Sequence, residues 1–139
     1  MKITWKRVCS YEEAKDFFEI IYLHEWDGSP FYWGIVDGAK FGGTKRKGDP
    51  NDRNGRYGPS YAHWIEGCLQ HGARLYIGQV ENKGEYSLDQ IEAFLIARYP
   101  SKMNKRKRTV LTIQEIGHYD DVPQSVLYGG RSLEQASRE

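Results

Sequence analysis

A turn signal between two β-prone runs constrains the fold of this chain more than any other feature. Residues 20–23 and 31–36 are rich in β-branched and aromatic residues, and Asp27-Gly28-Ser29-Pro30 lies between them. Side chains of these types fit the pleated surface of a sheet, whereas glycine and proline together mark a turn. The sequence therefore predicts a β-hairpin over residues 19–36, against which the rest of the chain has to pack.

Two segments downstream of the hairpin have the patterns of helices. Apolar residues recur at positions 61, 64, 65, 68 and 69 and stop before Gly72, which predicts a helix with one apolar stripe. Residues 87–90 form a capping box, and the helix that begins there should run to about Tyr99, because Pro100 follows.

Weaker patterns complete the order of elements. Ser10, with Glu13 at the third helical position, is expected to cap a helix that runs through Phe18. Residues 75–80 predict a third strand, residues 109–116 alternate as a fourth strand would, and a short helix is expected from Ser132. A long glycine-rich basic loop is expected over residues 37–58, and a loop of that length in a small domain is usually functional or mobile.

Length and element order together predict one small α/β domain. The 139 residues suffice for one domain with its own core and are too few for two ordinary ones. We expect residues 1–139 to form a single α/β sandwich. Its small, mainly antiparallel sheet would consist of the hairpin and the third strand, flanked by helices.

Cysteine usage and hydropathy exclude several classes of protein. Cys9 and Cys68 lie in different segments, without the spacing of a zinc site or the density of a secreted disulfide scaffold. His24, His71 and His118 likewise share no ligand spacing. The first residues lack a signal-peptide apolar region, and no apolar run approaches the roughly 18 residues of a membrane helix. We therefore expect a cytoplasmic protein with no membrane partner.

Glu92 is a carboxylate on the apolar face of the helix expected after Ser87. At about 100° per residue, it falls between Leu88 and Ile96, in the arc that should face the sheet. Desolvating a carboxylate costs several kcal/mol unless it is paired or binds a metal ion. Glu92 is therefore either a metal ligand or the partner of a nearby Arg or Lys at the sheet edge.

The predicted hairpin carries two spaced tyrosine motifs. Ile20-Ile21-Tyr22 is followed by nine residues and then by Tyr32-Trp33-Gly34. This pair resembles the signature of the GIY-YIG nuclease superfamily, whose two short motifs lie on adjacent strands. Ile20 stands in place of the first glycine and Trp33 in place of the second isoleucine, whereas both tyrosines and the second glycine are kept.

The order of later residues is also similar to that of the superfamily. The resemblance places Arg56 before a helix, then a strand at residues 74–80, then Glu92 on a second helix, and then Asn104. It covers roughly residues 19–108, which leaves a short N-terminal helix and a C-terminal extension outside a GIY-YIG-like core. Tyr76-Ile77-Gly78 matches the literal motif, but no tyrosine strand precedes it, and we interpret it as ordinary sequence of the third strand.

The resemblance implies a role for each of these residues in phosphodiester hydrolysis. Glu92 would bind one Mg²⁺ or Mn²⁺ ion per site. Tyr22 or Tyr32 would act near the attacking water, one of them as a general base through its phenolate. Arg56 would hold phosphate oxygens with its fork of donors, and Lys45 would assist. The structural alternatives are that the tyrosines belong to the core and that Arg56 is an ordinary surface residue.

The catalytic residues of this hypothesis should meet on one concave face. We expect Glu92 to share that face with both motif tyrosines and with Arg56, and not with Tyr76. Tyr61 and His63, in the helix after the basic loop, are further candidates. For Tyr61 the alternative is core packing on the apolar stripe, and for His63 it is an ordinary place on the surface.

Local basic clusters supply candidate nucleic-acid contacts, although the formal net charge is only +1. Five of the seven residues from 102 to 108 are cationic. Phosphate contacts from such a run give sequence-independent, salt-sensitive affinity, and a solvated charge run is the alternative. The candidate nucleic-acid-binding residues are Lys45, Arg46, Lys102, Asn104, Lys105, Arg106, Lys107 and Arg108.

Three functions are compatible with these patterns. The first is a metal-dependent endonuclease of GIY-YIG type that cuts double-stranded DNA as a monomer or a homodimer. The second is a degenerate member that binds nucleic acid without cutting it, which the missing first glycine favours. The third is a small protein-interaction domain whose many Tyr and Trp side chains form the interface.

Overall fold

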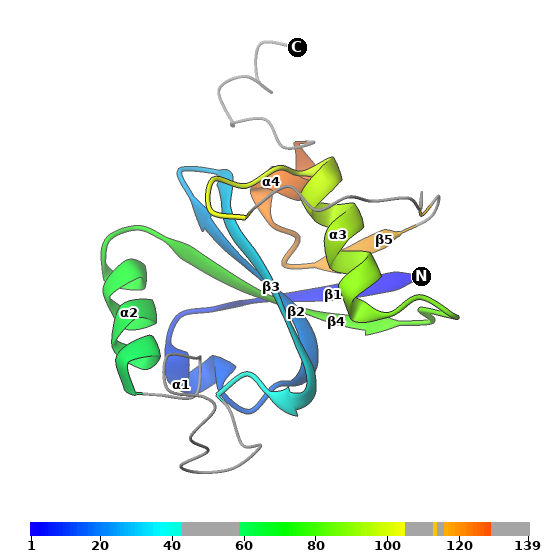
Figure 1. Ribbon diagram of the computed structural model, residues 1–139. Helices are drawn as coiled ribbons and strands as arrows, with labels where there is room; N and C mark the ends of the chain where they lie inside the picture. Colours follow the sequence, from blue (N-terminus) through cyan, green and yellow to red (C-terminus); the bar gives the residue numbers. More distant parts are fainter. Residues whose placement is uncertain (43–58, 105–112, 114–115, 129–139) are drawn as a thin grey trace.

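A five-stranded sheet with helices on both faces organises the chain (Figure 1). The computed structural model describes residues 1–42, 59–104, 113 and 116–128, without the side chains of residues 59–61. In chain order, the elements are β1 (Lys2–Val8), α1 (Tyr11–Ala14), β2 (Phe18–Trp26), β3 (Ser29–Lys40), α2 (Pro59–Gln70), β4 (Arg74–Glu81), α3 (Leu88–Arg98), β5 (Gly117–Asp120) and α4 (Gln124–Leu127).

The strand order is β3-β2-β4-β1-β5. The pairs β2–β3, β2–β4 and β1–β4 are antiparallel, whereas β1–β5 is parallel. The predicted α/β class is therefore confirmed, but the sheet is mixed. The expected sheet of a hairpin plus one further strand corresponds to β2, β3 and β4. The sequence patterns missed β1 and β5, which extend the sheet beyond β4.

β2 and β3 form the predicted hairpin around a two-residue turn. Trp26 pairs with Ser29, and the two residues between them, Asp27 and Gly28, have φ angles of 52° and 74°. Two consecutive positive φ angles characterise the type I′ turn, whose twist matches that of the flanking strands and which Asp and Gly tolerate. β3 continues to Lys40, so the strand is longer than the predicted run and includes residues 37–40 of the expected loop.

Alternation along β2 sends successive side chains to opposite faces of the sheet. Ile21 and Leu23 belong to a buried cluster with the apolar residues of α3, whereas Ile20 and Tyr22 belong to a second cluster that includes Ala14 of α1 and helix α2. Helix α3 therefore covers one face, and α1 and α2 cover the other (Figure 1). We call these the α3 face and the α2 face.

Side-chain caps fix the beginnings of two helices. Ser87 accepts a hydrogen bond from the Gln90 backbone N–H and its own N–H donates to the Gln90 side chain, which confirms the predicted capping box of α3. Ser10 caps α1 through the Glu13 N–H at 3.2 Å. The expected continuation of this helix through Phe18 is wrong. Phe18 already pairs with β3, so tertiary strand pairing overrides the local helical pattern.

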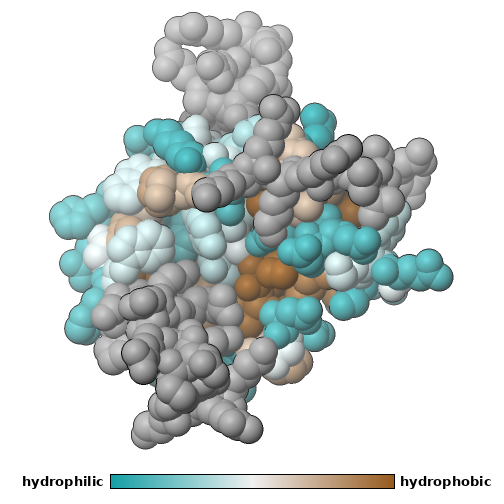
Figure 2. Space-filling model, in the orientation of Figure 1, coloured by the Kyte–Doolittle hydropathy of each residue, from teal (hydrophilic) through white to brown (hydrophobic). Residues whose placement is uncertain are grey.

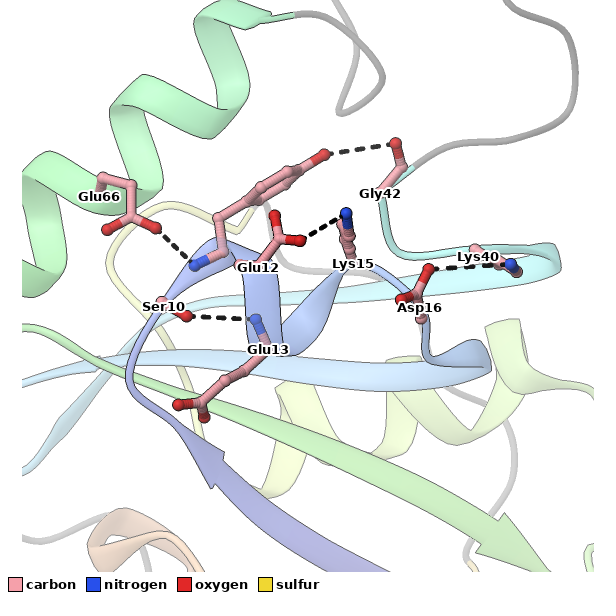
Figure 3. A network of polar contacts seen from close by, with 9 residues as sticks. Ser10, Glu12, Glu13, Lys15, Asp16, Lys40, Gly42 and Glu66 are labelled. Carbon is pink, nitrogen blue, oxygen red and sulfur yellow. Dashed lines mark hydrogen bonds and ion pairs between the residues drawn. The ribbon is translucent and has the colours of Figure 1, made fainter.

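Polar contacts hold α1 against both α2 and the end of β3 (Figure 3). The Tyr11 backbone N–H donates to a Glu66 carboxylate oxygen of α2 at 2.6 Å. The Tyr11 hydroxyl donates to the Gly42 carbonyl at 3.3 Å, and the Gly42 N–H donates to the Lys15 carbonyl at 2.8 Å. The position of α2 on its face of the sheet is therefore fixed partly by α1.

On the face that Figure 2 shows, the coloured surface is largely hydrophilic, with an apolar patch beside α3 over the strands. None of the described helices is both long enough and apolar enough to cross a membrane. The expected fourth strand lies outside the described residues except at positions 113 and 116, and the helix expected from Ser132 lies outside them entirely.

Candidate active site

Tyr22 and Tyr32 lie side by side on the α2 face. Their ring centroids are 6.1 Å apart. Tyr22 pairs with Gly34 across the hairpin and His24 pairs with Tyr32, which puts the three rings on the same face. Tyr22 is 3% exposed and Tyr32 is half-buried. The two motif tyrosines therefore meet, as the sequence predicts, and Tyr32 is the more accessible of the two.

Gly34 leaves the space that the Tyr22 ring occupies. A Cβ atom at position 34 would lie 2.1 Å from the Cζ and 2.3 Å from the hydroxyl oxygen of Tyr22. No side chain fits at such distances without displacing the ring. The glycine of the second motif and the tyrosine of the first are therefore parts of one steric arrangement.

His24 forms a triangle of rings with the two tyrosines, although no sequence motif singles it out. Its ring centroid is 5.8 Å from that of Tyr22, 6.4 Å from that of Tyr32 and 5.0 Å from that of Trp64 on α2. The side chain is 3% exposed, and its Nε2 atom is buried without a hydrogen-bond partner. Burial lowers the pKa of His24 to about 4, so the imidazole is neutral near pH 7. Its spacing of two residues from Tyr22 is the signal that places it on this face.

Glu92 projects from α3, on the other side of the sheet from the tyrosine pair. The apolar residues of α3 pack with Trp33, the neighbour of Tyr32 in β3, and Glu92 is 5% exposed. Because successive side chains alternate, Trp33 faces α3 and Tyr32 faces away from it. The expected meeting of Glu92 with Tyr22 and Tyr32 on one face is therefore wrong. Helix α3 instead shares its face with Tyr76, which the hypothesis had kept apart from Glu92.

Tyr76-Ile77-Gly78 lies in β4, as expected for ordinary strand sequence. Gly78 pairs with Trp5, and a Cβ at position 78 would lie 2.8 Å from the Trp5 ring and 2.9 Å from Ile3. Burial raises the pKa of Tyr76, which disfavours a phenolate. Core packing therefore explains this motif.

Asn104 binds the outer edge of β3. Its Oδ1 accepts a hydrogen bond from the Trp33 N–H at 2.7 Å, and its Nδ2 donates to the Trp33 carbonyl at 2.8 Å. The Met103 N–H donates to the Phe31 carbonyl at 3.0 Å. These contacts satisfy backbone groups of an edge strand, which gives Asn104 a structural role beside its predicted contact with nucleic acid. They also place the start of the basic run along the strand of Tyr32.

Only some of the remaining candidate residues from the sequence lie in the described part of the chain. Lys102 is exposed beside Met103, and His63 is exposed on α2. Tyr61 lies in α2, but its side chain is outside the described part of the chain. Outside the described residues lie Lys45, Arg46, Arg56, Lys105, Arg106, Lys107 and Arg108.

The described side chains do not assemble a metal centre. Within residues 1–42, 59–104, 113 and 116–128, no group of three or more His, Cys, Asp or Glu side chains is placed to hold an ion. Magnesium is often bound by one or two carboxylates with water and substrate phosphates. Among the described residues, Glu92 would therefore share such an ion mainly with oxygens from water or substrate, and neither motif tyrosine lies on its face.

Comparison with known proteins identifies no family for this chain. No protein-family model, no curated protein and no solved structure matches it significantly. What the fold and the site define is a class, an α/β domain with a tyrosine pair and a neutral histidine buried under one helical layer.

Proposed function

We propose that this chain is a nuclease of GIY-YIG type that hydrolyses DNA phosphodiester bonds at the tyrosine pair. The observation that supports this most is the arrangement of Tyr22, Gly34 and Tyr32. Two motifs separated by nine residues meet across the hairpin, where the first tyrosine occupies the space left by the second glycine. Core packing would explain Tyr22 against Gly34, but it does not require a tyrosine at position 32. The resemblance places both tyrosines and the glycine at these positions.

Tyr32 is the better candidate for contact with the substrate, because it is half-buried whereas Tyr22 is almost inaccessible. A tyrosine titrates near pH 10, so it acts as a general base near neutral pH only beside a cation. Neutral His24 supplies no positive charge there. The cation in this proposal is Arg56, Lys45 or a divalent ion, each of which comes from the sequence resemblance.

Nicking of supercoiled plasmid DNA with Mg²⁺ or Mn²⁺, against a control with EDTA, tests this proposal. Tyr32→Phe removes only the hydroxyl and should reduce cutting by about a hundredfold or more. The matched control is Tyr119→Phe, because Tyr119 is exposed on β5, away from the pair. Full activity of Tyr32→Phe would overturn the role of the tyrosine, and cutting in EDTA would overturn that of the metal. Linear product without accumulation of nicked circles indicates a homodimer.

Nucleic-acid binding without cleavage is the second candidate function, and the position of Glu92 favours it. The acidic residue proposed as the metal ligand lies across the sheet from the tyrosines, while Asn104 holds the start of the basic run against β3. Binding through that run should weaken steeply as salt rises, because it releases counterions from the phosphates.

Fluorescence anisotropy with labelled duplex DNA, run beside the nicking assay, separates the two functions. A nuclease that uses Glu92 loses cutting in Glu92→Gln and keeps its affinity for DNA. A binding module shows salt-sensitive affinity and cuts with neither metal. A chain with neither activity contradicts both proposals and returns the third alternative, a protein-interaction domain.

A further inference from the structure

An open apolar groove lies along α2, on the same side of the sheet as the tyrosine pair. It has a volume of about 480 Å³. Most of its lining residues carry planar rings, and none is an aliphatic core residue. They are Trp26 at the end of β2 and His63, Trp64, Gly67, Cys68 and His71 on or just after α2. We call this the α2 groove.

The ring of Trp64 connects the α2 groove to the candidate active site. Trp64 is 41% exposed, so part of its ring is accessible from the groove. Its ring meets that of His24 edge-on, with centroids 5.0 Å apart, and His24 in turn lies 6.4 Å from Tyr32. The ring of His24 therefore contacts both a residue of the groove and the tyrosine pair.

Gly67 keeps the middle of the groove open. A glycine in a helix interior costs up to about 1 kcal/mol relative to alanine. A Cβ atom at position 67 would meet nothing within 4 Å, so packing does not require this glycine. His63 and His71, four residues before and after this half-buried glycine, also line the groove. The result is a slot bordered by rings, with no side chain in its centre.

We propose that the α2 groove binds an unpaired nucleobase by stacking, which makes the preferred substrate a nucleic acid with a single-stranded segment. This inference rests on the proposed function, because it names the kind of nucleic acid that the same site takes. Every base has a flat apolar face that stacks on aromatic side chains without regard to sequence. A slot bordered by Trp and His rings suits a planar ligand better than the branched aliphatic side chains of a protein partner.

The two cysteines of the chain provide a test that needs no substitution. Cys68 lines the groove, whereas Cys9 is exposed elsewhere and serves as the internal control. Burial raises the pKa of Cys68, so its alkylation is best followed at mildly alkaline pH. Oligothymidine at about ten times its Kd should slow iodoacetamide alkylation of Cys68 about tenfold and leave the rate at Cys9 unchanged. Peptide mass spectrometry reads both rates in one sample.

Gly67→Leu tests the groove directly and keeps the fold, because leucine is a better helix former than glycine and a Cβ has room there. This variant should lose about tenfold in affinity for oligothymidine, since it blocks one stacking position. Its affinity for blunt duplex DNA should not change. The matched control is Phe18→Leu, which alters an aromatic residue that is 56% exposed outside the groove.

The outcomes separate this inference from the function on which it rests. If Cys68 alkylates equally fast with oligothymidine, or if Gly67→Leu binds it as the unsubstituted chain does, the groove proposal is overturned. Binding or cutting of duplex DNA in the same experiments would still support the proposed function. A chain that binds neither probe overturns both.

Discussion

The two faces of the sheet differ in how far the polar atoms of their aromatic residues are satisfied. On the α3 face, Trp5 Nε1 donates to His118 Nδ1 at 3.0 Å and Trp33 Nε1 donates to the Tyr99 carbonyl at 2.9 Å. On the α2 face, the Nε2 atom of His24 is buried without a partner. Buried polar atoms are nearly always paired, and exceptions call for an explanation. We therefore expect the α3 face to serve stability and the α2 face to carry the proposed site.

Glu25 qualifies this division without removing it. One of its carboxylate oxygens accepts hydrogen bonds from the Ser125 N–H at 2.9 Å and the Ser125 hydroxyl at 2.8 Å, and the other has no partner. Ser125 belongs to α4, whose Val126 packs in the cluster of the α3 face. Glu25 therefore attaches α4 to β2 on the α3 face, across the sheet from the tyrosine pair, and its role there is structural.

The largest effect that we expect separates two neighbours in β3. Trp33→Ala should lower the free energy of unfolding by about 3–5 kcal/mol, because it removes a fully buried ring and leaves the Tyr99 carbonyl without its donor. Tyr32→Ala, one residue away on the α2 face, should cost clearly less, because Tyr32 is half-buried. Urea denaturation of both variants measures the difference. Equal losses would contradict the assignment of stability to the α3 face.

Acid should destabilise the α2 face through His24. Its pKa falls from 6.5 to about 4 on folding because of burial. Between pH 6.5 and about 4, the unfolded chain therefore binds a proton at His24 that the native chain does not bind. The stabilisation is complete above pH 6.5 and is lost as the pH falls to about 4, which amounts to about 3 kcal/mol. Denaturant titrations across this pH range measure the slope.

His24→Phe keeps a ring beside the two tyrosines and should remove about half of this slope. Part of it should remain, because burial also lowers the pKa of His118 to about 4, and its Nδ1 accepts the Trp5 hydrogen bond only when unprotonated. His63→Gln is the control, since His63 is exposed. A slope that is unchanged in His24→Phe would show that His24 is not the buried titrating group.

Gly34→Ala should break the packing of the tyrosine pair. The new Cβ atom would lie 2.1 Å from the Tyr22 ring, and overpacking of this kind costs about 1–3 kcal/mol. In a Tyr22→Ala background the same change should cost little, because the ring that it meets is gone. A double-mutant cycle on the free energy of unfolding measures this coupling. Additive effects of the two substitutions on the free energy of unfolding would show that Gly34 does not make room for the Tyr22 ring.

Helices and strands whose ends are marked by neighbouring residues could be predicted from the sequence. Strands that form only because they pair with segments distant in the chain could not. The Asp27-Gly28 turn and the Ser87 capping box each fix a boundary within a few residues, and both are observed. β1 has only a weak pattern of its own, and it is a strand because it lies between β4 and β5, which come much later in the chain. No short window contains that information.

The candidate site divides in the same way. The pairing of Tyr22 and Tyr32 follows from the register of one hairpin, so sequence reasoning could place them together. The angular position of Glu92 at about 100° per residue correctly predicted that it lies on the buried side of α3. That angle cannot show which face of the sheet the helix covers. That choice depends on the connection from β4. His24 was missed because its burial depends on Trp64, a residue of another element.

The smallest effect that we expect has the opposite sign from the others and tests why the α2 groove is open. Gly67→Ala should raise the free energy of unfolding by up to about 1 kcal/mol, because alanine favours the helix and its Cβ atom meets nothing within 4 Å. Gly78→Ala, the matched control on the α3 face, should lower it, because that Cβ would lie 2.8 Å from Trp5. Thermal unfolding of the two variants compares the same change on both faces.

Opposite signs at these two glycines would show that the faces use glycine for different reasons. On the α3 face the residue makes room for a neighbour and stability depends on it. On the α2 face, Gly67 lowers stability and leaves the groove beside Trp64 open. This loss of stability is offset only if a ligand binds in the groove. A loss of stability in Gly67→Ala would instead mean that the groove is already filled by the protein, and the contrast between the faces would then rest on His24 alone.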